Sequence, residues 1–222
     1  MRPRGFTLIE VMVAMGVFGV VILFTFSTLN QAANEASIDT KSTKIEDQLQ
    51  YSVDTIIQDL KETSPSLVSL FSFEGQTQTA IVFPTARDQN GQFYLYKAGE
   101  TVQSTPDWQG VKVYAYAPDP TGQTDGRICC YGDYNWHSYT NPITVAALDA
   151  GTIRLSDGTS FSRTGAAKNG QQIRPLAGEF ASLTATGTSP ITLTVTSRLH
   201  HQAYDIDVPM SLTNEVMSRN RN

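Results

Sequence analysis

A long apolar run near the N-terminus constrains this chain more than any other feature. Residues 5–29 read GFTLIEVMVAMGVFGVVILFTFSTL, and no charged residue follows Glu10 in this stretch. Residues 6–29 would form a helix of about 36 Å, because each residue adds about 1.5 Å. That length crosses a hydrocarbon core of about 30 Å with some tilt. Since an isolated run satisfies its backbone in lipid only as a helix, we predict one membrane-spanning helix.

This N-terminus differs from a cleaved secretory signal. Such a signal has an apolar core of roughly 7–15 residues, followed by a small-residue cleavage site. Here the run is longer, and the small residue Gly5 precedes it, directly after a short basic leader. The carboxylate of Glu10 is costly inside an apolar run and requires a partner. Cleavage after Gly5 would supply one, the α-amine of Phe6 on the same chain or on a staggered neighbour.

These residues closely resemble the signal of type IV pilins and pseudopilins. In that family a prepilin peptidase cleaves after the glycine and methylates the new N-terminus. The resemblance therefore implies cleavage between Gly5 and Phe6, N-methylation of Phe6 and a role for Glu10 in subunit assembly. It implies as partners the prepilin peptidase, other pilin subunits and an inner-membrane assembly platform. The alternative is a generic single-pass anchor whose glutamate has no such role.

Within the family, the chain is most similar to minor pilins of the J and W type and to the J-type pseudopilins of type II secretion. Many major pilins carry a proline at the place of Ser27, which this chain lacks. Gly16 and Gly19 leave two interpretations open, a close helix approach or the higher glycine frequency of membrane helices. The basic leader predicts a cytoplasmic N-terminus and an exported head, which later joins a periplasmic or cell-surface filament.

The helix is predicted to continue beyond the membrane. Residues 31–64 contain neither proline nor glycine, and Pro65 then disfavours helix at the residue before it. One face of this amphipathic continuation carries apolar residues at helical spacing, namely Ile45, Leu49, Val53, Ile56 and Leu60. We therefore expect four parts: a leader (1–5), a transmembrane and assembly helix (6–30), its amphipathic continuation (31–64) and a β-rich globular head (65–222). The predicted fold class is α+β, a long spine helix packed on an antiparallel sheet.

The head reads as a series of short strands separated by turns. Alternation and turn residues predict strands over 67–73, 78–83, 92–97, 110–116, 127–131, 144–148, 152–155, 180–186, 191–198 and 204–212. Asn90-Gly91 is the strongest hairpin signal. The polar stretch 161–175 is predicted to be a loop.

Charge argues against nucleic acid as a direct partner. The net charge is −5, with 16 Lys and Arg against 21 Asp and Glu, and no basic cluster occurs. The adjacent Cys129 and Cys130 favour a local structural disulfide, although the ring that it closes is strained. Two thiols, or links to another chain, are the alternatives.

Candidate chemistry in the head is sparse. Asp119, Asp125 and Asp133 could serve as oxygen ligands for calcium. Their spacing is not that of an EF-hand, and aspartate is also common in turns for conformational reasons. We interpret the three histidines (His137, His200 and His201) as solvated surface residues and not as metal ligands. We therefore expect no cofactor. Four aromatic residues follow closely in the sequence, namely Tyr131, Tyr134, Trp136 and Tyr139. We expect some of them to cover the core beneath a loop, and the alternative is an exposed recognition surface.

We therefore expect a structural protein and not an enzyme, since no nucleophile elbow or phosphate loop occurs. The expected function is a minor type IV pilin or pseudopilin, a subunit of a helical filament for motility, DNA uptake or secretion. The alternatives are a major pilin and an adhesin or ligand-binding module displayed on the filament, with residues 129–139 as its tip.

Overall fold

The computed structural model describes residues 7–72, 79–94, 106–117, 126–134, 143–149, 152–162, 171–176, 180–201 and 206–217. The chain forms two compact units, Met1–Lys44 and Ile45–Asn222. The first unit is helical in its described residues, and the second unit contains all the described strands. The fold class is α+β, as the sequence predicts.

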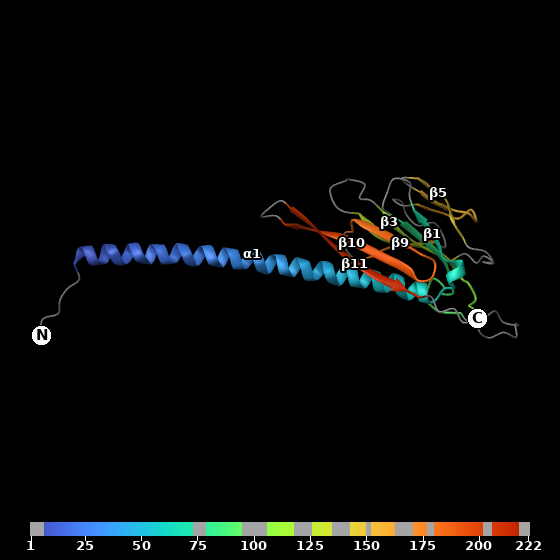
Figure 1. Ribbon diagram of the computed structural model, residues 1–222, viewed down its shortest axis with the longest axis horizontal. Coiled ribbons are helices and arrows are strands. Elements are labelled where there is room, and N and C mark those ends of the chain that lie inside the picture. Colours follow the sequence, from blue (N-terminus) through green and yellow to red (C-terminus); the bar gives the residue numbers. More distant parts are fainter. Residues whose placement is uncertain are drawn as a thin grey trace. The chain divides into compact units, whose positions relative to one another are not determined.

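A single helix, α1 (Leu8–Lys61), contains 54 residues and is drawn in blue in Figure 1. Its length confirms the predicted continuation beyond the apolar run. After Lys61 the chain turns and enters a short 3₁₀ helix, η1 (Pro65–Leu67), with Pro65 in its first turn. Proline is tolerated there because its missing N–H would have no helical partner, so Pro65 marks the stop that the sequence indicates.

The second unit contains three antiparallel sheets. The central sheet has the order β1-β2-β3-β4-β8, with β1 (Ser69–Ser72), β2 (Thr79–Thr85), β3 (Gly110–Ala117), β4 (Arg127–Asp133) and β8 (Gln171–Pro175). A second sheet has the order β11-β10-β9, with β9 (Ser182–Thr186), β10 (Ile191–His201) and β11 (Ile206–Val216). A small third sheet is formed by β5 (Val145–Asp149), β6 (Thr152–Leu155) and β7 (Ser160–Ser162).

The central sheet is buried on both faces, because successive side chains of a strand point to opposite sides. One face joins α1 and the second sheet in a core that includes Ile81, Phe83 and Tyr114. The other face packs on the small third sheet through residues that include Val113 and Tyr131, and the ring of Tyr131 lies 5.8 Å from that of Phe161. This double burial explains why β2 and β3 are almost continuously apolar.

Within the second unit, the end of α1 contributes the apolar stripe that the sequence predicts. Val53, Ile56 and Leu60 are fully buried in the core shared with the central and second sheets. Burying each such side chain contributes roughly 1.5–3 kcal/mol. This segment of α1, from Ile45 on, is therefore part of the head by its packing.

The structure corrects several strand predictions. The stretch 161–175, predicted to be a loop, contains the end of β7 and all of β8. Strand β8 reads QQIRP and lies at the edge of the central sheet, where exposed side chains need no apolar alternation. In place of a strand over 92–97, residues 92–94 form only an isolated bridge between Arg87 and Phe93, and residues 95–97 lie outside the described residues. The turn at Gly91 is present, with a φ of 82°.

Candidate assembly site

The candidate site lies at the beginning of α1, where Thr7 and Glu10 cap the helix reciprocally. The backbone N–H and the hydroxyl of Thr7 both donate to Glu10 Oε2 at 2.9 Å. The N–H of Glu10 approaches Thr7 Oγ1 at 3.4 Å in return. Because Leu8 is the first helical residue, Thr7 and Glu10 occupy the two positions of a capping box.

This arrangement gives Glu10 a partner that sequence reasoning missed. We expected its carboxylate to depend on the amine of Phe6, but Thr7 already supplies two hydrogen bonds from the same helix end. The signal was present in the sequence, since Thr7-Leu8-Ile9-Glu10 matches the pattern of a threonine followed three residues later by a glutamate. A carboxylate in the first turn also interacts favourably with the helix dipole.

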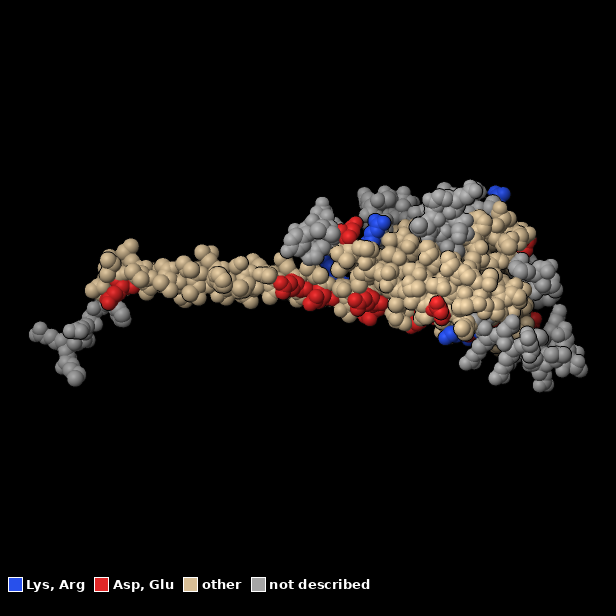
Figure 2. Space-filling model, in the orientation of Figure 1, with Lys and Arg blue, Asp and Glu red and all other residues tan. Residues whose placement is uncertain are grey.

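Apolar side chains cover α1 beyond this cap. The large apolar residues from Leu8 to Leu29 are 39–81% exposed, so no face of this segment is buried within the described part of the chain. Figure 2 shows acidic atoms near the beginning of this segment and an uncharged surface after them. The helix is long and apolar enough to cross a membrane. Soluble proteins rarely expose so large a continuous apolar surface, so lipid or protein must cover it.

The acid of Glu10 lies at one end of a shallow hollow on the helix surface. The hollow is lined by one face of the helix, Glu10, Val11, Ala14, Met15 and Phe18. The small side chain of Ala14 leaves space between Met15 and Phe18, and Glu10 places the one charge of this segment beside that space. An apolar helix that carries a cationic group near this level would match both features.

The two threonine hydroxyls beyond the cap of the apolar segment are satisfied by the helix itself. The hydroxyl of Thr25 donates to the carbonyl of Val21 at 2.8 Å, and that of Thr28 donates to the carbonyl of Thr25 at 2.9 Å. These side chains therefore need no partner from outside the helix in a medium without water. Glu10 is the one charged residue among residues 8–29 and is therefore the side chain of this segment best suited to pair with a cationic neighbour.

The other predicted residues of the N-terminal segment have different outcomes. Gly5 and Phe6 lie outside the described residues, so the predicted cleavage remains an expectation. A Cβ atom added at Gly16 or Gly19 would meet no atom within 4 Å. Both glycines thus lie open on the helix surface. This position agrees with a close approach of another helix and equally with the general frequency of glycine in membrane helices.

The structure contains no disulfide between Cys129 and Cys130, in contrast to the favoured prediction. Both residues belong to β4, and regular strand geometry directs neighbours to opposite faces. Cys129 is buried in the core between the central and third sheets, whereas Cys130 packs toward α1. Burial raises the pKa of the Cys130 thiol to about 11.

Of the three predicted calcium ligands, Asp133 is the one that belongs to the described residues. Asp133 is buried in β4, where Gln171 Nε2 donates to its Oδ2 at 3.1 Å, but Asp119 and Asp125 lie outside the described residues. Among the described residues, no group of three or more potential metal ligands occurs.

Some of the predicted histidines and aromatic residues belong to the described part of the chain. His200 and His201 are neighbours in β10, and His137 lies outside the described residues. Tyr131 belongs to the core, which agrees with the packing interpretation, and Tyr134 lines a pocket described below. Trp136 and Tyr139 also lie outside the described residues.

Comparison with known protein families yields one match, which coincides with this site. The family model described as the prokaryotic N-terminal methylation motif matches residues 1–26. This motif is the signal of type IV pilins and pseudopilins, and it implies processing by a prepilin peptidase and assembly with other pilins. The family that it marks is structural. Comparisons with curated proteins and with solved structures return no match.

Proposed function

We infer that this chain, a type IV pilin-like or pseudopilin precursor by its N-terminal motif, functions as a minor subunit of a helical filament. One observation carries the inference. The motif covers a helix end whose apolar side chains are exposed on every face and whose single acid lies beside a shallow hollow. Such a helix is soluble in lipid and equally suited to a bundle of similar helices.

Assembly exchanges lipid neighbours for protein neighbours. Both media are apolar, so the exchange gains little from hydrophobicity and depends on packing and polar contacts. Glu10 provides the polar contact. Cleavage between Gly5 and Phe6 frees the α-amine of Phe6, which is then methylated. This amine on a neighbouring subunit pairs with the carboxylate that Thr7 holds in place. The attraction between two charges is strong in a medium without water and falls as their distance grows, so the pair favours the stagger that brings amine and carboxylate together.

The proposal includes location and partners. The basic leader stays in the cytoplasm, α1 crosses the inner membrane, and the head is exported. The prepilin peptidase meets the chain there, and an inner-membrane assembly platform moves the mature subunit into the filament. The role requires no catalysis and no cofactor.

The test compares two glutamates of the same helix. Glu10→Ala should insert into the membrane normally and fail to enter filaments, because its neighbour's amine would lack a counter-charge. Glu46→Ala is the matched control, since Glu46 is an exposed glutamate of α1 beyond the apolar segment. The measurement is the ratio of subunit in sheared filaments to subunit in membranes. Equal incorporation of both variants would overturn the role of Glu10.

A major pilin is the competing assignment within the same family. Ser27 in place of proline and the size of the head favour a minor subunit. Abundance in purified filaments separates the two, because a major pilin forms most of the filament mass and a minor pilin forms a small fraction.

A further inference from the structure

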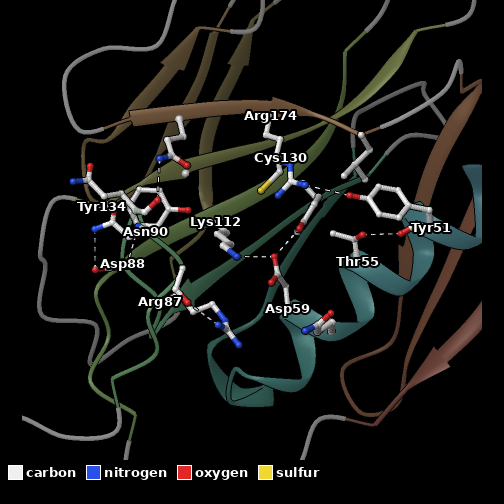
Figure 3. A pocket seen from close by; sticks show the side chains of 17 residues that line it. Tyr51, Thr55, Asp59, Arg87, Asp88, Asn90, Lys112, Cys130, Tyr134 and Arg174 are labelled. Carbon is white, nitrogen blue, oxygen red and sulfur yellow. Dashed lines mark hydrogen bonds and ion pairs between the residues drawn. The ribbon is translucent and has the colours of Figure 1, made fainter.

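A polar pocket of about 470 Å³ opens in the head between the end of α1 and the central sheet (Figure 3). Its helix wall carries Tyr51, Thr55 and Asp59, which recur at helical spacing on one side of α1. The turn at residues 88–91 and Tyr134 complete the rim. The volume lies in the range of small-molecule sites, roughly 300–1,000 Å³.

The register of the central sheet builds the floor of this pocket. Tyr114, Cys130 and Arg174 are directly paired across β3, β4 and β8. The neighbouring row on the same face is Lys112, Gly132 and Gln172. Gly132 leaves the middle of that row without a side chain, which contributes to the hollow. A Cβ atom there would lie 2.8 Å from the ring of Tyr134, so glycine also lets this ring cover the strand.

The carboxylates of the pocket are already engaged. Asp59 Oδ2 accepts hydrogen bonds from Lys112 Nζ at 2.7 Å and from the Tyr114 hydroxyl at 2.6 Å. Asp88 accepts from the N–H groups of Asn90 and Gln92, both at 2.9 Å, within its own turn. The charge of Asp59 is thus paired with that of Lys112, whereas Asp88 is held in place by the N–H groups of its own turn.

Two of the three cations are engaged as well. Lys112 is paired with Asp59, as described above. Arg87 donates through Nε and Nη2 to the two carboxylate oxygens of Glu62, and through Nη1 to the carbonyl of Gly91. Lys112 and Arg87 thus each have a carboxylate partner, and Arg87 has a backbone acceptor in addition.

Arg174 differs from the other cations of the pocket. It is exposed, and its Nη2 donates a hydrogen bond of 3.2 Å to the neutral hydroxyl of Tyr51. Among the described residues, no carboxylate lies within ion-pair distance of it. Arginine presents a planar set of donors that matches a carboxylate in a bidentate manner. The pocket therefore offers one guanidinium without a carboxylate partner among the described residues, surrounded by hydroxyls, side-chain amides and three tyrosine rings.

We propose that this pocket binds an acidic sugar, with Arg174 pairing with its carboxylate and the surrounding amides and hydroxyls contacting its hydroxyl groups. A sugar acid uses all three features of the pocket. Its carboxylate matches the guanidinium, its hydroxyls match Gln172, Asn90 and Thr55, and its apolar ring face matches the tyrosines. The inference goes beyond a filament role, and it stands or fails independently of that role.

Other anions fit the pocket less well. A phosphate dianion favours several converging cations, whereas the pocket leaves one unpaired within the described residues. An acidic side chain of a peptide would pair with Arg174 but would bring no hydroxyl groups to the neighbouring side-chain amides. The observations therefore favour a monoanionic ligand rich in hydroxyl groups.

The experiment uses the full chain in detergent micelles and measures binding of glucuronate and N-acetylneuraminate by saturation-transfer NMR and calorimetry. Both acids should bind, and glucose, which lacks the carboxylate, should bind at least about tenfold more weakly. Arg174→Gln should lower affinity for the acids by about tenfold to a hundredfold while leaving the melting temperature unchanged. Arg154→Gln is the matched control, because Arg154 is an exposed arginine of the third sheet. It should bind like the wild type.

A second variant tests the shape of the pocket. Gly132→Ala should displace the Tyr134 ring, narrow the hollow and weaken binding without removing charge. Absence of saturation transfer from both sugar acids at millimolar concentration would overturn the proposal. Equal affinity of Arg174→Gln and the wild type would also overturn it. If an N-acetylated aspartate peptide bound more strongly than either sugar acid, the sugar proposal would be overturned in favour of a protein partner.

Discussion

The contact between Asp59 and Lys112 offers the sharpest test of how the head is held together. Asp59 belongs to α1, and it links the helix to β3 through Lys112 and the Tyr114 hydroxyl. The side chains of Lys112 and Asp59 are only 12% and 15% exposed. Asp59→Ala would leave the ammonium of Lys112 nearly buried without a counter-charge, which costs about 3–5 kcal/mol for fully buried pairs. Because both residues retain some exposure, we expect a loss of about 3 kcal/mol in unfolding free energy.

The assay is thermal unfolding of the full chain in detergent, followed by near-ultraviolet circular dichroism, which reports on the packed aromatic side chains of the head. A loss of about 3 kcal/mol lowers the melting temperature of a unit of this size by about 6–12 °C. Asp54→Ala is the control, because Asp54 is an exposed acid of the same helix that accepts a hydrogen bond only from Gln50. Its effect should stay within about 0.5 kcal/mol.

The double variant Asp59→Ala, Lys112→Met separates charge from packing. Removing both members of the pair eliminates the unpaired ammonium, so the double variant should be more stable than Asp59→Ala alone. The reasoning fails if the single variant melts like the wild type. It also fails if the double variant loses the sum of the two single effects, since the two residues would then not interact.

Two further perturbations test the cap and the thiols. Thr7→Ala should destabilise the first turn of α1 by about 1 kcal/mol, seen as faster amide exchange at residues 8–11, whereas Thr7→Ser should restore protection. Unchanged exchange in Thr7→Ala would show that the Thr7 hydroxyl does not cap the helix. Cys130 should resist alkylation at pH 8 in the folded chain, because its pKa of about 11 leaves roughly a thousandth of it as thiolate. The unfolded chain should take up two labels without reductant, and no uptake would reveal a disulfide between Cys129 and Cys130.

Much of the fold follows from local signals in the sequence. The absence of proline and glycine over 31–64, the apolar spacing from Ile45 to Leu60 and the stop at Pro65 predict α1 nearly to its ends. The closing strands β9, β10 and β11 also follow, because they alternate apolar and polar residues between clear turns. The capping box was equally local, and it required only that Thr7 be considered together with Glu10.

The features that sequence reasoning missed depend on contacts between distant residues. Strand β8 is polar, and its strand character comes from pairing with β4 across more than thirty residues. The pocket depends on the register that aligns Lys112 with Gly132 and Gly132 with Gln172, which no local pattern encodes. The separation of the two cysteines, in contrast, follows from the strand that the sequence predicts over 127–131, because neighbouring residues of a regular strand point to opposite faces.

The most direct test of the filament role is the intact mass of the chain purified from cells that contain its prepilin peptidase. The proposal predicts a protein that has lost residues 1–5, begins at Phe6 and carries one additional methyl group, both in membranes and in sheared filaments. Gly5→Val should retain the leader and stay in the membrane. A chain that keeps Met1 under these conditions, or one that matures but never enters a polymer, would contradict the assignment.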